Sequence, residues 1–349
     1  MRLIPTDEQK DLAAAVRAFV AETSPLSRVR EVAESGEPYD RRVWARMSGE
    51  LGLPGLVIPE EHGGAGAGRG ELGAVLEELG AALTPSPLLG AVFAADLLLA
   101  CGDAGAAKDL LPGIAAGTTI ATAFWANPDD PAIEVRSGEL HGVAPRVLNG
   151  ADADLVLVAA GDGLYAVESG FTATPLTTLD LTRPQARLEF AGTPARRAGT
   201  ADVARALDLA SVALAAEQLG GLRRCLDVIV EYAKLRVQFG RYVGSFQGVK
   251  HKLADMHCVL EQAESIVRYA CWAADEDPSE LPVAAALAQS YLGRAYFRVA
   301  KDHLLLHGGI GFTWEHDAHL YYKRAKTDEL LLGAPRHHRT RLAGHLGLL

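Results

Sequence analysis

The stretch with the clearest chemical potential is Glu231–Gly240, which reads Glu-Tyr-Ala-Lys-Leu-Arg-Val-Gln-Phe-Gly. Arg236 is a permanent cation that stands close to an amide, Gln238, and an aromatic ring, Phe239. These are the groups needed to hold a phosphate and to pack against a flat cofactor. The pattern predicts a helix that ends at Gly240, then a turn and a second helix. An ordinary helical hairpin with a solvent-reaching arginine fits the same residues, so both interpretations stay open.

Other motifs associated with catalysis are incomplete. Gly68, Gly70 and Gly73 have the GxGxxG spacing of a dinucleotide site, but a Pro-Glu-Glu-His loop precedes them within helical sequence. Because that fingerprint needs a preceding strand, we interpret these glycines as part of a flexible interhelical loop. The chain also contains no GxSxG motif of a serine hydrolase.

Two pairs of histidines have a suggestive spacing. His303 and His307 stand four residues apart on a predicted helix, as in zinc enzymes, but no HExxH glutamate lies between them and no third ligand is evident. We therefore expect no metal site. His337 and His338 lie among arginines near the C-terminus, and we interpret them as a solvated basic patch.

The composition restricts the classes of function. Of the 349 residues, 49% are hydrophobic and 22% charged, which is typical of a globular chain with two or three domains. The net charge of −10 and the lack of a basic stripe argue against nucleic acid as a partner. No apolar run is long enough to span a membrane and Met1–Pro5 turns polar at once, so we expect no membrane association and a cytoplasmic protein. The cysteines form no CxxC pair and are expected to be reduced and mostly buried: Cys101, Cys225, Cys258 and Cys271.

Helix signals dominate the first third of the chain. Thr6 and Gln9 have the spacing of a capping box, and apolar residues then repeat on one helical face. Further helices are predicted over Arg41–Leu51, Gly70–Leu83 and Leu88–Cys101. We expect an N-terminal helical domain over residues 1–115.

The pattern changes after Thr118 to short runs rich in Val, Ile, Leu and Thr, separated by turn residues. It predicts antiparallel strands over residues 119–125, 139–148, 155–160, 164–167 and 187–190. The segment 116–198 is too short for a large sheet, so we expect a compact β barrel or sandwich.

Helix signals return at Ala201 and continue to the C-terminal region. They predict long helices over residues 201–238, 246–275, 282–307 and 320–332. The first is apolar on nearly every side between Leu207 and Leu219, which is typical of a helix enclosed by others. We expect a C-terminal helical bundle over residues 199–349 that also forms a subunit interface. The whole chain is thus predicted to be mainly α with a small β domain.

Several motifs resemble those of the acyl-CoA dehydrogenase family. Tyr-Ala-x-x-Arg-x-Gln-Phe-Gly from Tyr232, followed by Phe-Gln-x-x-x-His-x-x-Ala-Asp-Met up to Met256, is similar to the family's C-terminal signature. His307–Glu315 resembles its Gly-Gly-x-Gly-Phe segment, and Gly52–Gly55 with Pro59–Gly64 resembles its N-terminal domain. The similarity covers the whole chain in order.

The resemblance implies an oligomeric flavoprotein of lipid metabolism that binds FAD between subunits and desaturates an acyl-CoA thioester. In the family a carboxylate removes the α proton while the β hydrogen leaves as hydride to flavin N5, and an electron-transfer protein accepts the electrons. By the same resemblance, Arg236, Gln238 and Phe239 would contact the FAD of the adjacent subunit. Gly308 and Gly309 would lie close to it.

The family's catalytic glutamate is missing from both positions that it usually takes. Counting without gaps from Phe312 places the C-terminal position on Leu332. Counting back from Tyr232 places the alternative position on Ala210. Neither residue can act as a base.

Glu217 is the one acid in the apolar helix and lies two turns after Ala210 on a similar face. It is a weak candidate for a displaced base with a raised pKa. A structural carboxylate, bonded to a neighbouring helix or to Arg223 or Arg224, is the alternative interpretation.

The middle segment also departs from the family pattern. Trp125–Pro128 replaces a Thr-Glu-Pro segment that contacts flavin, and Arg146–Gly150 replaces a Trp-Ile-Thr-Asn-Gly segment. Leu305 stands where many members have a glutamine near the adenosine. The flavin-ring face is therefore expected to be degraded, while the arginine arm is retained.

This asymmetry predicts the partner subunit of a heteromeric acyl-CoA dehydrogenase, which completes the FAD site of a catalytic sister chain. Some members that resemble this chain are heterotetramers that act on bulky CoA esters such as steroid side chains. A flavin-dependent monooxygenase or oxidase of the same fold is one alternative, since such enzymes also lack the glutamate. A flavin-free scaffold subunit is the other.

Overall fold

The structure, a computed structural model, describes residues 3–127 and 130–349. Pro128, which ends the segment Trp125–Pro128, lies outside the described residues, as do the first two residues. The chain forms two compact units. The helical unit comprises Met1–Leu26, Gly73–Thr84 and Ser211–Leu349, and the mixed unit comprises Ser27–Leu72 and Pro85–Ala210. The expected domain boundaries near residues 115 and 198 stay a prediction.

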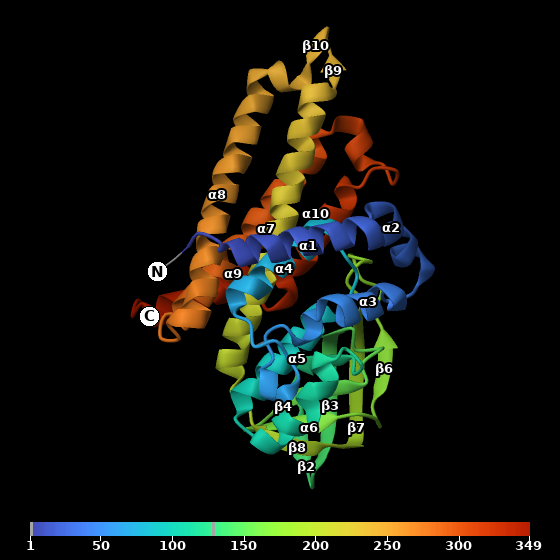
Figure 1. The fold of residues 1–349 in the computed structure, drawn as a ribbon, viewed down its shortest axis with the longest axis vertical. Helices are drawn as coiled ribbons and strands as arrows, with labels where there is room; N and C mark the ends of the chain where they lie inside the picture. Colours follow the sequence, from blue (N-terminus) through green and yellow to red (C-terminus); the bar gives the residue numbers. More distant parts are fainter. Residues whose placement is uncertain (1–2, 128–129) are drawn as a thin grey trace. The chain divides into compact units, whose positions relative to one another are not determined.

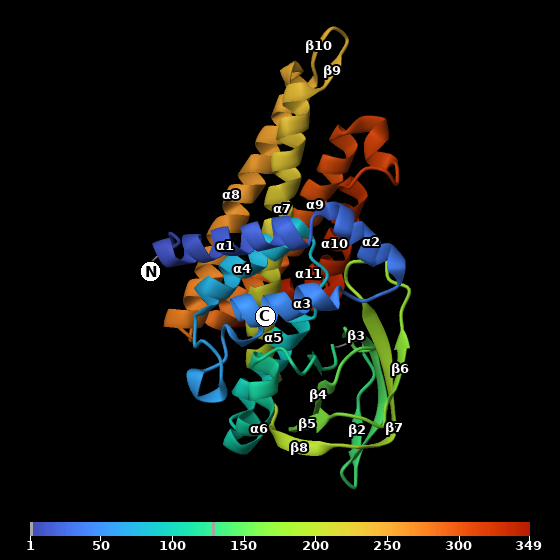
Figure 2. The ribbon, with the colours of Figure 1, turned by 45° about the vertical axis from the view of Figure 1, so that its right-hand side comes forward.

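Two long helices, α7 (Val203–Leu235) and α8 (Gln247–Glu276), run side by side toward the hairpin that joins them (Figures 1 and 2). From Ser211 onward α7 belongs to the helical unit. Helix α9 (Leu281–Leu306) packs against α8 and against two later helices, α10 (Ala318–Leu331) and α11 (Pro335–His345). The other elements of this unit are α1 (Asp7–Thr23), the second part of α4 (Arg69–Ala82), and the short helices η3 (Val243–Ser245) and η4 (Gly308–Phe312).

Helix α1 begins as the capping box predicts. The hydroxyl of Thr6 accepts from the Gln9 backbone N–H at 3.1 Å, and the Gln9 side chain accepts from the Thr6 backbone N–H at 3.0 Å. Each side chain thereby satisfies a backbone donor that the first helical turn leaves unpaired.

Two glycines allow α4 and α7 to cross with their backbones in contact. A Cβ atom on Gly220 would lie 1.8 Å from the Glu77 carbonyl oxygen, and one on Gly80 would lie 2.1 Å from the Glu217 carbonyl oxygen. Any larger residue at either position would force the helices apart. Every residue from Ser211 to Leu222 is buried, as the nearly uninterrupted apolar pattern predicts.

The predicted end of α7 at Gly240 is wrong, because the helix ends at Leu235 and a tight hairpin follows. Its strands are β9 (Val237–Gln238) and β10 (Arg241–Tyr242). Phe239 and Gly240 form the turn with φ of 52° and 76°, the backbone of a type I′ turn. Glycine adopts this conformation freely, whereas phenylalanine does so at an energetic cost.

Two four-stranded sheets share the core of the mixed unit. One has the order β1 (Ala121–Phe124), β4 (Leu155–Ala160), β5 (Gly163–Val167), β8 (Arg196–Thr200). The other has the order β2 (Glu134–Arg136), β3 (Glu139–Leu148), β7 (Gln185–Pro194), β6 (Thr172–Pro175). Buried side chains from both sheets pack in one cluster that includes Phe124, Val158 and Leu188. The predicted small β domain, with its packed barrel or sandwich core, is thus present within a mainly helical chain.

One strand pair contradicts the prediction that the strands are all antiparallel. Strands β1 and β4 pair in parallel, with Ala121 opposite Leu155. Strands β2 and β3, which belong to the other sheet, lie between them in the sequence, and this long crossover permits a parallel return.

Four helices of the mixed unit are α2 (Leu26–Ser35), α3 (Arg41–Leu51), α5 (Leu88–Cys101) and α6 (Ala104–Ala115), with the short helices η1 (Leu53–Gly55) and η2 (Glu60–His62). Helix α5 packs against β1 and is apolar apart from Asp96, which pairs with Arg69, and all its residues up to Leu98 are buried. The predicted bounds of α3 and α5 are confirmed. Helices α2, α6 and α11 and strands β2, β6 and β8 were not predicted.

Candidate functional site

The predicted cofactor arm lies at the exposed end of the α7–α8 pair. Arg236 is exposed, and no side chain among the described residues pairs with its guanidinium. Gln238 Nε2 donates to the Val237 carbonyl at 3.0 Å, and the Phe239 side chain is 92% exposed at the tip of the turn. A strained backbone that presents an exposed aromatic ring is a feature found at ligand sites.

Two residues outside the predicted set hold this arm in shape. The Phe246 ring meets the Phe239 ring edge-on at 6.2 Å. The Arg241 guanidinium lies over the Phe246 ring, 3.9 Å from the ring centre, which is within the range of a cation–π contact. Sequence analysis missed Arg241, because its contact depends on the hairpin that replaces the predicted helix end.

The second predicted segment is joined to the arm by a direct contact. Gly308 and Gly309 begin η4 and are exposed, and Gly308 has a φ of 69°. The hydroxyl of Tyr232, one turn before Arg236, donates to the His307 carbonyl at 3.3 Å. The structure therefore brings the two motifs together, although some 70 residues separate them in the sequence.

Neither glutamate position holds a carboxylate. Leu332 is buried at the end of α10, and its carbonyl accepts a hydrogen bond from His338 Nε2 at 3.0 Å. The interpretation of His338 as solvated is wrong, since its side chain is fully buried and Arg341 lies 3.4 Å from its Nδ1. Burial lowers the pKa of His338 to about 4. Ala210, at the other position, is buried in α7.

Glu217 is held by an ion pair within the helical unit. Its Oε1 lies 3.1 Å from Arg324 Nη1 of α10, and both side chains are more than nine-tenths buried. The partner on a neighbouring helix is Arg324, whereas Arg223 pairs with Glu264 at 2.9 Å. A carboxylate fixed in this way is less free to reach a substrate than an unpaired one.

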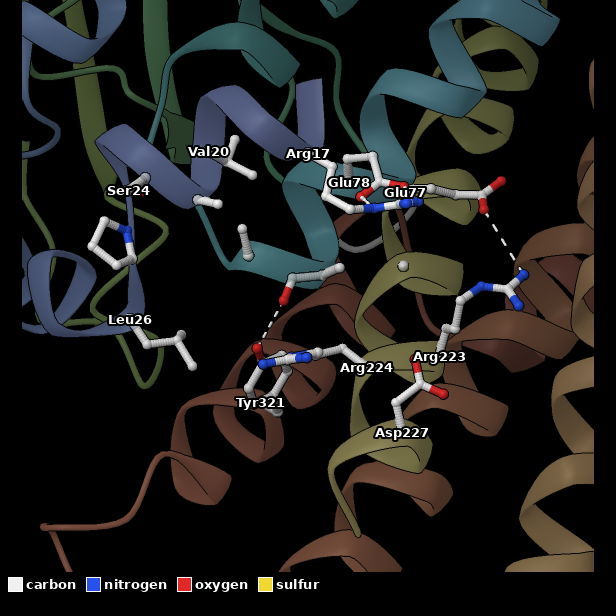
Figure 3. Close-up of a pocket in the computed structure, with 15 residues that line it drawn as sticks. Arg17, Val20, Ser24, Leu26, Glu77, Glu78, Arg223, Arg224, Asp227 and Tyr321 are labelled. Atoms are coloured by element: carbon white, nitrogen blue, oxygen red, sulfur yellow. Dashed lines mark hydrogen bonds and ion pairs between the residues drawn. The ribbon is translucent and has the colours of Figure 1, made fainter. Parts of the chain in front are cut away.

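A cavity of about 650 Å³ in the helical unit is lined by charged residues that the sequence did not point to (Figure 3). Arg17 of α1 binds Glu78 of α4 through two hydrogen bonds of 2.9 and 2.6 Å. Glu77 lies 2.5 Å from Arg268 of α8, and burial raises the pKa of its carboxyl group. These acids are paired with cations of the same unit, so we interpret the network as structural.

The segments that differ from the family pattern on the flavin-ring side are tied to each other in the mixed unit. Arg146 lies 2.8 Å from Asp130, and the Asn127 amide donates to the same carboxylate at 3.0 Å. Trp125 is buried and packs against Phe93 at 6.0 Å between ring centres. The polar groups of both segments are therefore partly occupied by contacts within the chain.

The remaining candidates take structural positions. The residues before Gly68 and Gly70 form helices and turns, so these glycines do not follow a strand. In the described ranges no group of three or more His, Cys, Asp or Glu residues is placed to hold a metal ion. The four cysteines are free, but only Cys225 and Cys271 are buried, while Cys258 is exposed. The expectation of mostly buried thiols is thus only half right.

Comparisons with known proteins decide the family. The model for the acyl-CoA dehydrogenase N-terminal domain matches residues 6–118, and the model for the C-terminal domain matches residues 197–347. The chain belongs to the acyl-CoA dehydrogenase family. The resemblance found in the motifs is thereby confirmed, and the family is one of flavoprotein oxidoreductases.

Several acyl-CoA dehydrogenases are similar over almost the whole chain. Acyl-CoA dehydrogenase IpdE2 of Mycobacterium tuberculosis is 39% identical over 96% of both chains. A chain of the ChsE4-ChsE5 complex of the same organism superposes with a TM-score of 0.92 and 30% identity over all of both chains. A chain of the Tcur3481-Tcur3483 steroid ACAD G363A variant superposes with a TM-score of 0.88 and 29% identity over 98% of both chains. The predicted fold is confirmed.

The structure, over residues 3–127 and 130–349, was compared with what a membrane-spanning helix requires. None of its helices, as far as the chain is described, combines the length and the apolarity that crossing a bilayer requires.

Proposed function

We propose that this chain is the partner subunit of a heteromeric acyl-CoA dehydrogenase. It lends Arg236, Gln238 and Phe239 to an FAD that is held mainly by a catalytic sister chain. When bound, FAD accepts the hydride in the α,β-desaturation of an acyl-CoA thioester. The two similar structures that are named as pairs of chains, ChsE4-ChsE5 and Tcur3481-Tcur3483, support a heteromeric assembly.

The observation that carries the proposal is the contrast between the arm and the flavin-ring segments. Arg236 is exposed and has no side-chain partner within the described part of the chain, and the ring of Phe239, three residues on, is exposed as well; these groups fit a diphosphate and a flat ring. On the flavin-ring side, Arg146 and Asp130 are instead paired with each other. The arm is thus suited to a cofactor that another chain holds.

The missing base supports the same division of labour. Leu332 and Ala210 offer no proton acceptor, and Glu217 is already paired with Arg324. A desaturase needs a base within hydrogen-bond reach of the α proton. We therefore assign the base to the sister chain, and to this chain the tasks of orienting the cofactor and excluding water around it.

The substrate is expected to be an acyl-CoA thioester, and an electron-transfer protein is expected to reoxidise the complex. One similar structure is described as a steroid ACAD, so steroid acyl thioesters belong in the first substrate panel. A bulky acyl group is consistent with a heteromer in which only one of the two kinds of chain has kept a catalytic site.

The test is the flavin absorbance of the purified chain, alone and in complex with each acyl-CoA dehydrogenase-like chain of its source. We expect a nearly colourless chain alone, and a stable complex with one FAD for every sister chain. A homo-oligomer with full flavin that bleaches with acyl-CoA under anaerobic conditions would overturn the proposal. Oxygen-coupled consumption of reduced flavin would indicate a monooxygenase, and a complex without flavin would indicate a scaffold.

A further inference from the structure

A stack of aromatic rings adjoins both predicted cofactor segments, the arm around Arg236 and the segment Gly308–Phe312. His307, the residue that closes α9, is 4.6 Å from the ring of His303 and 4.3 Å from the ring of His316. On the side of α7, the Tyr232 ring lies 4.5 Å from His307. The four rings come from the end of α7, the end of α9 and the approach to α10.

His307 and His316 also satisfy backbone groups at the two ends of the glycine segment. His307 Nδ1 donates to the His303 carbonyl at 2.8 Å. This carbonyl is one of the last of α9 and lacks a helical partner. His316 Nδ1 accepts from the backbone N–H of Ala318, the first residue of α10, at 3.1 Å. One imidazole thus closes the helix before the segment, and the other opens the helix after it.

The same stack reaches the arm through Tyr232. Its hydroxyl donates to the His307 carbonyl, and its own carbonyl accepts from the Arg236 N–H at 2.9 Å in the last turn of α7. Arg236, through Tyr232, and Gly308, as the next residue in the chain, are therefore both held in place by contacts of His307.

We propose that His307 is a positioning residue that holds the Arg236 hairpin and the Gly308–Phe312 segment as one surface for the cofactor. This inference rests on the proposed function for the identity of the ligand. The coupling between the two segments, however, is a property of the chain alone and is tested without a partner.

The positioning role requires a neutral His307 imidazole. Burial, and the neighbouring His316, lower the pKa of His307, although its bond to the His303 carbonyl opposes this. The groups that face the rings of His303 and His307 include Tyr232 and Arg224 from α7 and Tyr321 from α10. Protonation of the buried His307 ring at acid pH would place a charge beside the rings of His303 and His316, so the segments should separate as the pH falls.

The test compares His307→Phe and His307→Ala with wild type, and uses His257→Phe as the control because His257 is an exposed histidine of α8. Hydrogen exchange of the chain alone is measured over residues 236–246 and 308–317. We expect His307→Ala to speed exchange in both segments by about tenfold, the size of one lost hydrogen bond with its ring contact. The phenylalanine variant keeps the ring but loses the hydrogen bond, and should show a smaller effect.

In the complex, the dissociation constant for FAD is measured at pH 7.5 and pH 5.5. We expect wild type to bind FAD more weakly at the lower pH, and His307→Phe to bind it weakly at both with a reduced pH dependence. Exchange that rises only near residue 307, with residues 236–246 unchanged, overturns the inference, and so does unchanged FAD affinity in both variants. If instead the chain shows coupled exchange but no complex holds FAD, the positioning role stands and the proposed function fails.

Discussion

The buried ion pair between Glu217 and Arg324 gives the sharpest prediction on stability. Its two side chains are 8% and 2% exposed, and the charged atoms are 3.1 Å apart. Replacing Glu217 by Gln leaves the Arg324 guanidinium buried beside a neutral amide. Removing one partner of a buried pair costs about 3–5 kcal/mol, because the remaining charge keeps its desolvation penalty and loses its counterion. The amide oxygen can still accept a hydrogen bond, so we expect a loss of about 3 kcal/mol.

Urea unfolding of the full chain, followed by circular dichroism, measures this loss directly. Arg324→Met should cost a similar amount, since it removes the cation that lies 3.1 Å from the buried carboxylate. The double variant Glu217→Leu with Arg324→Met should be much more stable than the sum of the two single losses predicts, because neither member of the pair is then left buried without the other. Glu261→Gln is the control, since it makes the same chemical change at an exposed position of α8.

If Glu217→Gln lowered the free energy of unfolding by less than about 1 kcal/mol, the reasoning would be refuted, because an exposed ion pair contributes that much. The same variant also tests the remaining catalytic role. Unchanged turnover of the complex removes Glu217 as a base, while a large loss of turnover with unchanged stability would make it one.

The remaining predictions concern acid stability. His303 and His338 are buried, and burial lowers their pKa values to about 3 and about 4, below the unfolded value of 6.5. The unfolded chain therefore binds protons more readily than the folded chain between these values, so the free energy of unfolding should fall as the pH drops from 6.5 toward 4. Each unit of difference between the folded and unfolded pKa values contributes about 1.4 kcal/mol to the free energy of unfolding, which amounts to several kcal/mol for the two residues together. His338→Gln, which keeps a donor for the Leu332 carbonyl, should flatten the pH dependence of urea unfolding; an identical slope would contradict the role of burial.

Features set by neighbours in the sequence could be predicted from the sequence. The capping box at Thr6 depends on residues three positions apart, and the bounds of α5 follow from a run between Pro87 and Gly102 that is apolar except for Asp96. The end of α7 could not be located in this way. The Gln238–Arg241 pairing competes with the last helical turn, and a phenylalanine at positive φ is not a local signal for a type I′ turn.

Features that depend on tertiary pairing were missed or only partly right. The pattern placed Glu217 inside an apolar helix but could not identify Arg324 as its partner, since the two belong to helices far apart in the chain. The charged residues that line the cavity could not be predicted to lie together for the same reason. His338 was misjudged because its flanking arginines indicate a surface, whereas the fold buries the imidazole against the Leu332 carbonyl.

The predicted site residues Arg236, Gln238 and Phe239 lie together because they belong to one motif. The family resemblance predicted only that Gly308 lies close to the same FAD. The contact between Tyr232 and His307, which joins the two segments in the structure, is encoded by no local pattern. The role of these residues toward FAD stays a prediction.

The most direct test of the central claim is the FAD content of the complex when Arg236 of this chain alone is replaced by Ala. Lys234→Ala is the matched control, since Lys234 is an exposed cation at the same helix end, paired with Glu231. We predict that Arg236→Ala leaves the complex assembled but strongly depleted of FAD, while the control retains it. Full FAD retention and unchanged turnover in Arg236→Ala would contradict the claim that this chain completes its partner's cofactor site.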